Sequence, residues 1–224
     1  MKFSIFSKNK GLPRESASWR RSGGFTLIEL IVVMAVATSL MTAVVIQQNS
    51  WNDRLAVNTQ AYELVLMIRQ AQIYALGVRV DTTGPEIDKF DVGYGIYIDE
   101  DLDDSNGKIN RYIYFADRDD GSGEGNKKYD SGEEIETKTF NRGVYIEKFC
   151  GTTGGNPCNN SGGSLNQLNI TFFRPDPEAI IRLLNNGGGS GGTNSPVTIS
   201  LKSAGGKVYS VTVQDNGQVS ITQS

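Results

Sequence analysis

The feature that most constrains this chain is an apolar run of twenty-two residues near its N-terminus, Phe25 to Ile46. At about 1.5 Å per residue, a helix of this length covers the ~30 Å hydrocarbon core of a bilayer. Its only charged residue is Glu29. Six basic residues and one acid precede the run, so the positive-inside rule keeps the N-terminus in the cytoplasm and sends the rest outward. The run therefore predicts a single membrane-spanning helix.

Two details distinguish this run from an ordinary anchor or secretory signal. The pair Gly23-Gly24 precedes it, and the Glu29 carboxylate costs several kcal/mol in lipid unless it finds a partner. A cut between Gly24 and Phe25 would create an α-amino group one helical turn from Glu29, on the same or a neighbouring molecule. The small residues 35–37 also suit a conventional signal cleavage, but that cut would discard this arrangement. We therefore favour a processed anchor.

The sequence Gly24-Phe25-Thr26-Leu27-Ile28-Glu29 resembles the processing site of type IV pilins and of the pseudopilins of type II secretion. The resemblance implies cleavage after Gly24 by a prepilin peptidase, N-methylation of Phe25 and a role for Glu29 in assembly. It implies that Glu29 pairs with the terminal ammonium of a neighbouring subunit. Other pilin or pseudopilin subunits and an inner-membrane assembly platform are the further partners. The protein would sit in the inner membrane with its head outside the cytoplasm, then enter an extracellular or periplasmic filament.

The helical pattern continues beyond the apolar run. Neither Gly nor Pro occurs between Phe25 and Leu76, and Gly77 is a plausible end signal. Apolar residues recur at spacings of three and four, widened by further apolar neighbours, so we expect the second half of this helix to be apolar on one side only. A break near residues 47–52 is the alternative. The apolar positions are Val57, Ala61, Leu64, Ile68, Ala71 and Ala75, widened by Tyr62, Val65, Leu66, Ile73 and Leu76.

After Gly84-Pro85 the pattern changes to short runs rich in β-branched and aromatic residues. These predict an α+β fold in which the long helix packs on an antiparallel sheet, or on two. The arrangement resembles minor pilins and H-type pseudopilins. We expect a leader at residues 1–24, a transmembrane helix at 25–46, an amphipathic helix at 47–79 and a head at 80–224 with a Gly-rich loop at 185–195. The predicted strands are 92–98, 109–116, 143–149, 167–173, 197–202, 207–213 and 218–222.

Residues 99–136 hold thirteen acidic and five basic residues, a net charge of −8 that equals the charge of the whole chain after the leader. Carboxylates alternating with Asn and Gly suit Ca²⁺, which binds many oxygens on a flexible loop. Solvated loops that keep a sheet edge soluble are the alternative. No cofactor is required by the sequence, and calcium is the one ion it suggests. The candidate ligands are Asp99, Asp101, Asp103, Asp117, Asp119, Asp130 and Glu133.

Catalysis is not expected. The chain has no histidine, which removes the commonest general base and the commonest zinc ligand. Its two cysteines, Cys150 and Cys158, lie on the side expected to be oxidising, so we predict a disulfide. Two metal-binding thiolates are the alternative, but the remaining ligands are missing.

The sequence therefore predicts a structural subunit of a type IV pilus or a type II secretion pseudopilus. The alternative is a binding module at the filament tip, either an adhesin or a DNA-uptake receptor. The acidic balance argues against nucleic acid. That argument would fail if certain basic residues gathered on one face of the head, namely Arg142, Lys148, Arg174, Arg182, Lys202 and Lys207.

Overall fold

The computed structural model describes residues 23–77, 92–118, 125–152, 158–159, 165–185, 190–193 and 195–223. The chain divides into two units, one ending at Val45 and the other beginning at Ile46, and each is described by itself. The predicted leader up to Ser22 and the candidate ligand Asp119 lie outside the described residues.

A single helix, α1 (Leu27–Leu76), occupies the N-terminal part of the described chain. It has no break near residues 47–52, as expected for a stretch without Gly or Pro. The helix ends at Leu76, as Gly77 indicated and short of the boundary at residue 79 given for its amphipathic part. Gly77 N–H donates to the Ile73 carbonyl at 2.9 Å.

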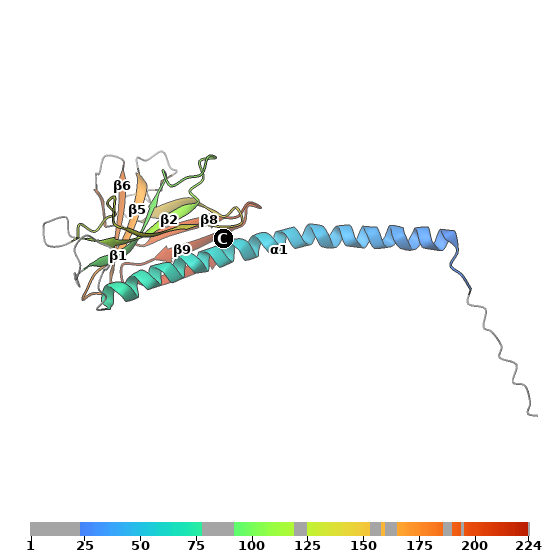
Figure 1. The fold of residues 1–224 in the computed structure, drawn as a ribbon, viewed down its shortest axis with the longest axis horizontal. Helices are drawn as coiled ribbons and strands as arrows, with labels where there is room; N and C mark the ends of the chain where they lie inside the picture. The colour runs from blue at the N-terminus through green and yellow to red at the C-terminus, as the bar shows by residue number, and fades with distance from the viewer. Residues whose placement is uncertain are drawn as a thin grey trace, which may run out of the picture. The chain divides into compact units, whose positions relative to one another are not determined.

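Two antiparallel sheets form the rest of the second unit (Figure 1). The α+β prediction is confirmed, and a long N-terminal helix packed on antiparallel sheets fits a pilin fold. The six-stranded sheet has the order β3 (Glu134–Thr139), β2 (Arg111–Asp117), β1 (Gly93–Asp99), β5 (Leu165–Phe172), β6 (Ala179–Asn185), β7 (Ser190–Thr193). The four-stranded sheet has the order β10 (Val219–Gln223), β9 (Val208–Val213), β8 (Val197–Lys202), β4 (Tyr145–Gly151).

Each of the seven predicted strands has a counterpart, but β3, β6 and β7 were not predicted. Strand β7 falls inside the expected Gly-rich loop 185–195, so the loop prediction is wrong for residues 190–193. There Thr193 pairs with Arg182 and Ser190 with Leu184 of β6. Hydrogen bonds between backbone groups make this pairing. A strand can therefore form here without the β-branched and aromatic residues on which the strand predictions relied.

The core lies between the two sheets and the part of α1 that follows Ile46. Both turns of the β8–β9–β10 meander reach the helix, because Asp53 abuts Gly205 and Gln72 abuts Gly217. Gln72 also donates to the Pro177 carbonyl at 3.0 Å. The predicted buried positions are confirmed, each at most 1% exposed, namely Val57, Ala61, Leu64, Ile68, Ala71 and Ala75.

The opposite face of this part of α1 departs from the prediction. Tyr62, Leu66 and Ile73 were expected to widen the buried stripe, but they are 55%, 65% and 65% exposed. At about 100° per residue they lie with Trp51 and Leu55 on the outward side of the helix. The helix within the head is therefore apolar on two faces, not one, and the second face is uncovered.

A smaller apolar cluster lies apart from the main core. Tyr97, Ile113 and Phe115 pack there against Leu102 and Tyr129. The segment 125–133 carries Tyr129 and is tied to β5 because Tyr129 N–H donates to Asn169 Oδ1 at 2.8 Å. This part of the acidic segment therefore packs on the six-stranded sheet as an additional layer.

Candidate functional site

The helix start is built around Thr26. Its Oγ1 accepts the Glu29 N–H at 3.2 Å, and its carbonyl accepts the Leu30 N–H at 3.1 Å. Thr26 is thus the N-cap and Glu29 is the third helical residue, the spacing of a capping box. This Thr-x-x-Glu signal was present in the sequence and was not used in the predictions above.

The residues at the expected cut are open to approach. Phe25 is 81% exposed, and a Cβ added to Gly23 or Gly24 would meet no atom within 4 Å. The fold around these two glycines therefore places no steric demand for glycine. Glu29 is also exposed, and its side chain has no ion-pair partner among the residues that the structure describes.

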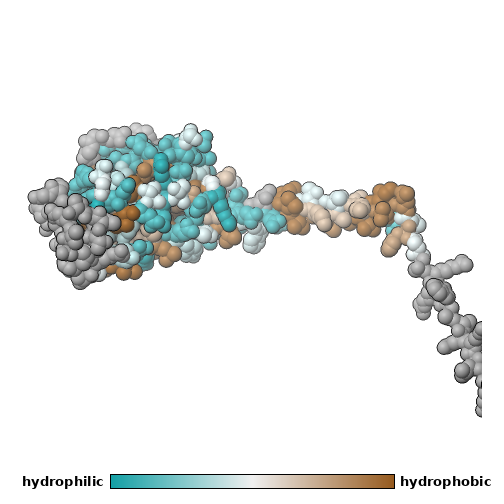
Figure 2. All heavy atoms as spheres, viewed as in Figure 1, coloured by the Kyte–Doolittle hydropathy of each residue, from teal (hydrophilic) through white to brown (hydrophobic). Residues whose placement is uncertain are grey.

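The first part of α1 is apolar on every side and is uncovered in a single chain. None of its most apolar stretch is buried in the single chain, and the helix is long and apolar enough to cross a membrane. Figure 2 shows this stretch as a largely brown surface. Its hydroxyls are satisfied within the helix, because Thr38 Oγ1 donates to the Met34 carbonyl at 2.9 Å and Thr42 Oγ1 to the Thr38 carbonyl at 2.8 Å. The segment is consistent with membrane anchoring.

The candidate calcium ligands fall into two separate groups. Asp99 ends β1, whereas Asp117 pairs with Gly93 at the start of β1. About six residues of strand separate the two positions, on the order of 20 Å. The seven carboxylates therefore cannot surround one ion.

In the first group, donors of the chain itself occupy the Asp99 carboxylate. Asp99 accepts from the Tyr97 hydroxyl, from Gln167 Nε2 at 2.9 Å and from the Asp101 N–H at 3.0 Å. Burial raises the pKa of Tyr97, and the bond to Asp99 raises it further. Beside this group the backbone closes a turn through the bridge between Asp103 and Ile109. This segment acts as a structural turn and hydrogen-bond network.

The second group holds the segment 125–133 against the six-stranded sheet. Asp117 is fully buried, and its Oδ2 accepts the Lys127 N–H at 2.6 Å. Glu133 Oε1 and Oε2 accept the N–H groups of Arg118 and Asp130, each at 2.8 Å. Burial raises the pKa of Asp117 to about 7, and the nearby Glu133 carboxylate adds to that rise. Asp117 Oδ1 accepts no hydrogen bond from the described part of the chain.

Within the described residues no three acidic, cysteine or histidine side chains are placed so that they could hold a metal ion. The backbone amides noted above already serve Asp99, Asp117 and Glu133. Asp119 lies outside the described ranges, so calcium binding by the segment 99–136 stays a prediction.

The two cysteines are joined in a disulfide. Cys150 lies in β4, an edge strand, and Cys158 makes a bridge beside it. Next to Cys158, Asn159 exchanges two hydrogen bonds with Phe149, at 3.1 and 2.9 Å. The disulfide therefore fastens Cys158 and Asn159 along the edge of the four-stranded sheet, further along β4 than the bridge from Ile109 to Ile146.

Replacing both cysteines by serine is expected to lower the free energy of unfolding, because the disulfide no longer restricts the unfolded chain. The closed loop is short, so the expected loss is about 2 to 3 kcal/mol. Denaturation of the oxidised protein and of the double variant measures this difference. Alkylation of the untreated protein should find no free thiol, and alkylation after reduction should find two. Free thiols in the untreated protein would contradict the bridge.

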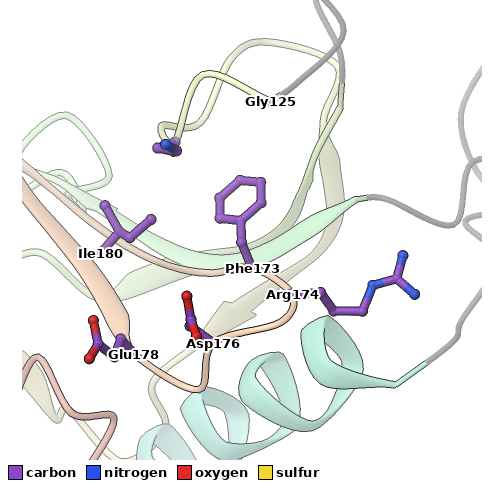
Figure 3. Close-up of a pocket in the computed structure, with 7 residues that line it drawn as sticks. Gly125, Phe173, Arg174, Asp176, Glu178 and Ile180 are labelled. Carbon is purple, nitrogen blue, oxygen red and sulfur yellow. The ribbon is translucent and has the colours of Figure 1, made fainter.

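A surface pocket of about 260 Å³ lies beside the β5–β6 connection. Figure 3 shows Phe173 and Ile180 lining it, with Asp176 and Glu178 on the adjoining loop and the Arg174 side chain directed away from both carboxylates. Phe173 fits there because Gly93 has no side chain, as a Cβ on Gly93 would lie 2.4 Å from the ring. Lys127 and Arg174 line the pocket together with Asp176 and Glu178. Because both signs of charge are present, the charge of the lining does not indicate a class of ligand.

The six basic residues considered for nucleic acid do not share one sheet. Lys148 and Lys202 belong to the four-stranded sheet, whereas Arg182 belongs to the six-stranded sheet. Two of these cations are already engaged, since Lys202 pairs with Glu147 at 2.6 Å and Arg182 donates to the Asn126 carbonyl at 3.0 Å.

Residues 19–45 match the family model described as the prokaryotic N-terminal methylation motif. No curated protein and no solved structure matches the chain. The match covers the expected cut, Phe25, Glu29 and almost all of the apolar segment. The chain carries the prepilin-type signature, in agreement with the pilin and pseudopilin family.

Proposed function

We propose that this chain is a structural subunit of a type IV pilus or a type II secretion pseudopilus, with no catalytic activity of its own. A prepilin peptidase would cut after Gly24 and methylate the new amine of Phe25. The observation that carries the proposal is the N-terminal methylation motif at residues 19–45, followed without interruption by one helix to Leu76.

The uncovered apolar part of α1 supports this function. A helix that is apolar all round requires lipid or other helices around it. Lipid would surround it before assembly, and the helices of neighbouring subunits would do so in a filament. The head, with its acidic loops, would then form the filament surface.

The two glycines before Phe25 support recognition by a peptidase. Nothing within 4 Å would meet a Cβ at either position, so packing within the described chain gives no reason for glycine there. An enzyme that closes on the backbone at the cut would meet any added side chain.

Replacing Gly24 by leucine is therefore expected to block maturation, leaving full-length precursor in the membrane, with processed protein reduced about a hundredfold or more. Intact-mass measurement of the membrane fraction distinguishes precursor from a chain that begins at methylated Phe25. The matched control is Gly23→Leu, one residue further from the cut, for which we expect a smaller loss. Normal maturation of Gly24→Leu would exclude the peptidase assignment.

A further inference from the structure

The head carries an uncovered apolar stripe on the outward face of α1. At about 100° per residue its members fall within an arc of roughly 80°, opposite the face buried in the head. Asn58 and Arg69 fall in the same arc, so the stripe is apolar with two polar interruptions. Exposed large apolar side chains gathered on one face mark an interaction site. The stripe consists of Trp51 (71% exposed), Leu55 (57%), Tyr62 (55%), Leu66 (65%), Ile73 (65%) and Leu76 (39%).

A pocket of about 360 Å³ opens beside this stripe, between α1 and the edge strand β3. Leu66 belongs to both the stripe and the pocket wall. Met67 and the almost completely buried Tyr112 supply the apolar lining. Glu63, Lys138 and Asn141 supply polar groups. An apolar pocket with a few polar groups is the usual form of a specific binding site.

The pocket is held in shape by hydrogen bonds across it. Gln60 of α1 accepts the Asn141 N–H at 3.0 Å and donates to Glu63 Oε2 at 2.7 Å. The Tyr112 ring packs on Phe140 with the ring centroids 5.3 Å apart. The helix and the β3 end of the sheet are thus joined beneath the pocket, so an incoming side chain would meet a formed site.

Trp51 has the chemistry that this pocket would accept. It is the most exposed large apolar side chain of the head, and it makes no ring contact with any other described residue. Its indole would gain apolar burial against Leu66 and Tyr112 and a sulfur contact with Met67. Its N–H would find an acceptor in the free oxygen of Glu63, which uses only Oε2 for Gln60. Tryptophan residues that enter such pockets commonly dominate protein interfaces.

We propose that Trp51 of one copy of this chain inserts into the pocket formed by Gln60, Glu63, Leu66, Met67, Tyr112 and Lys138 of a second copy. The proposal rests on the assembly function proposed above and names one contact of that assembly. On α1, Trp51 precedes the pocket residues by nine to sixteen positions, and of these Leu66 lies on the same face as Trp51. A copy cannot fill its own pocket with Trp51, because about 14 to 24 Å of rigid helix separates them.

The contact is heterologous, since it joins different surfaces of the two copies. Contacts of this type do not close a dimer and instead produce an open helical array with a fixed step. The step along α1 would equal the separation of Trp51 from the pocket, about 14 to 24 Å. The remaining stripe residues would lie along the neighbouring helix once Trp51 is seated.

Photo-crosslinking in the cells that make the filament tests the contact directly. Full-length chain with p-benzoylphenylalanine in place of Trp51 is expressed together with an affinity-tagged second copy. After irradiation we expect a dimer whose cross-linked peptide in the tagged copy contains residues 60–67 or 138–141. Cross-links only to lipid, to a different subunit or to other residues of the tagged copy would overturn the proposal.

Two substitutions in the tagged copy provide the matched control. Thr139→Tyr would fill the pocket and lower the cross-linked dimer about tenfold or more. Thr137→Tyr, on the same face of β3 but away from the pocket, should change it by less than about twofold. Equal loss in both variants would count against the pocket.

Recovery of the chain in filaments sheared from the cells separates a failure of the proposed function from a failure of the Trp51 contact. Sheared filaments that lack the wild-type chain would defeat the proposed function. Filaments that contain the wild-type chain but give no cross-link to the pocket would defeat only the Trp51 contact.

Discussion

Replacing Glu29 by alanine is expected to leave the chain in the membrane at normal or higher amounts and to remove it from filaments. In the single chain this carboxylate is exposed and has no ion-pair partner among the described residues. Lipid favours its loss, since a membrane carboxylate costs several kcal/mol. In a filament, the ammonium of a neighbouring Phe25 would pair with it, and an unpaired charge left there costs about 3 to 5 kcal/mol. That cost corresponds to at least about a hundredfold loss of incorporation.

Quantification of the chain in sheared filaments and in membranes measures this effect. Glu29→Gln should fall between the wild type and Glu29→Ala, because it keeps a hydrogen bond but loses the charge. Thr26→Ala is the matched control, since it removes the helix cap and leaves the carboxylate in place. A capping role alone would make Thr26→Ala and Glu29→Ala equally defective, at a cost of about 1 kcal/mol. Wild-type amounts of Glu29→Ala in filaments would show that the carboxylate does not direct assembly.

Replacing Asp117 by asparagine is expected to make the head more stable above neutral pH. Burial raises the pKa of this carboxyl from 3.8 to about 7. Between these two values the unfolded chain ionises while the folded chain keeps the proton, so the stability of the wild type falls as the pH rises. The asparagine variant cannot ionise, and its oxygen can still accept the Lys127 N–H.

The pKa difference of about three units sets an upper limit of about 4 kcal/mol, and relaxation of the site makes about 2 kcal/mol the expected gain. Thermal unfolding of the mature protein in detergent, near pH 4 and near pH 8, measures the difference between variant and wild type. The difference should grow with pH and level off above neutrality. Asp176→Asn, an exposed carboxylate without a described partner, is the control and should show no such trend. A gain that is the same at both pH values would contradict ionisation as its cause.

The elements that sequence patterns predicted well are those whose side chains alone determine them. The absence of Gly and Pro and the apolar spacing from Val57 to Ala75 were enough to predict α1 and its buried face. The β8–β9–β10 meander was equally clear, because branched residues alternate between two obvious turns.

The sequence could not place elements that depend on tertiary neighbours. Strand β3 is almost fully exposed and charged, and it exists because the edge of β2 offers hydrogen bonds. The spacing of Leu66 and Ile73 is compatible with the edge of the buried stripe or with the outward face of the helix. How far the sheets extend around the helix decides between the two, and both side chains are exposed. The acidic segments looked like ion ligands because the amides that bind Asp99 and Asp117 come from backbone placed by folding.

The cap at Thr26 also determines what a protease encounters. The helix begins at Leu27, so the peptide bond between Gly24 and Phe25 lies before the first helical turn and outside its hydrogen bonds. Proteases act on exposed backbone, and here that backbone needs no local unfolding. The proposed cleavage would therefore break no helical hydrogen bond, and the helix would keep the same first residue in the precursor and in the processed chain. Its effect on the helix would be a change of charge at an end that is already formed, with no refolding of the anchor.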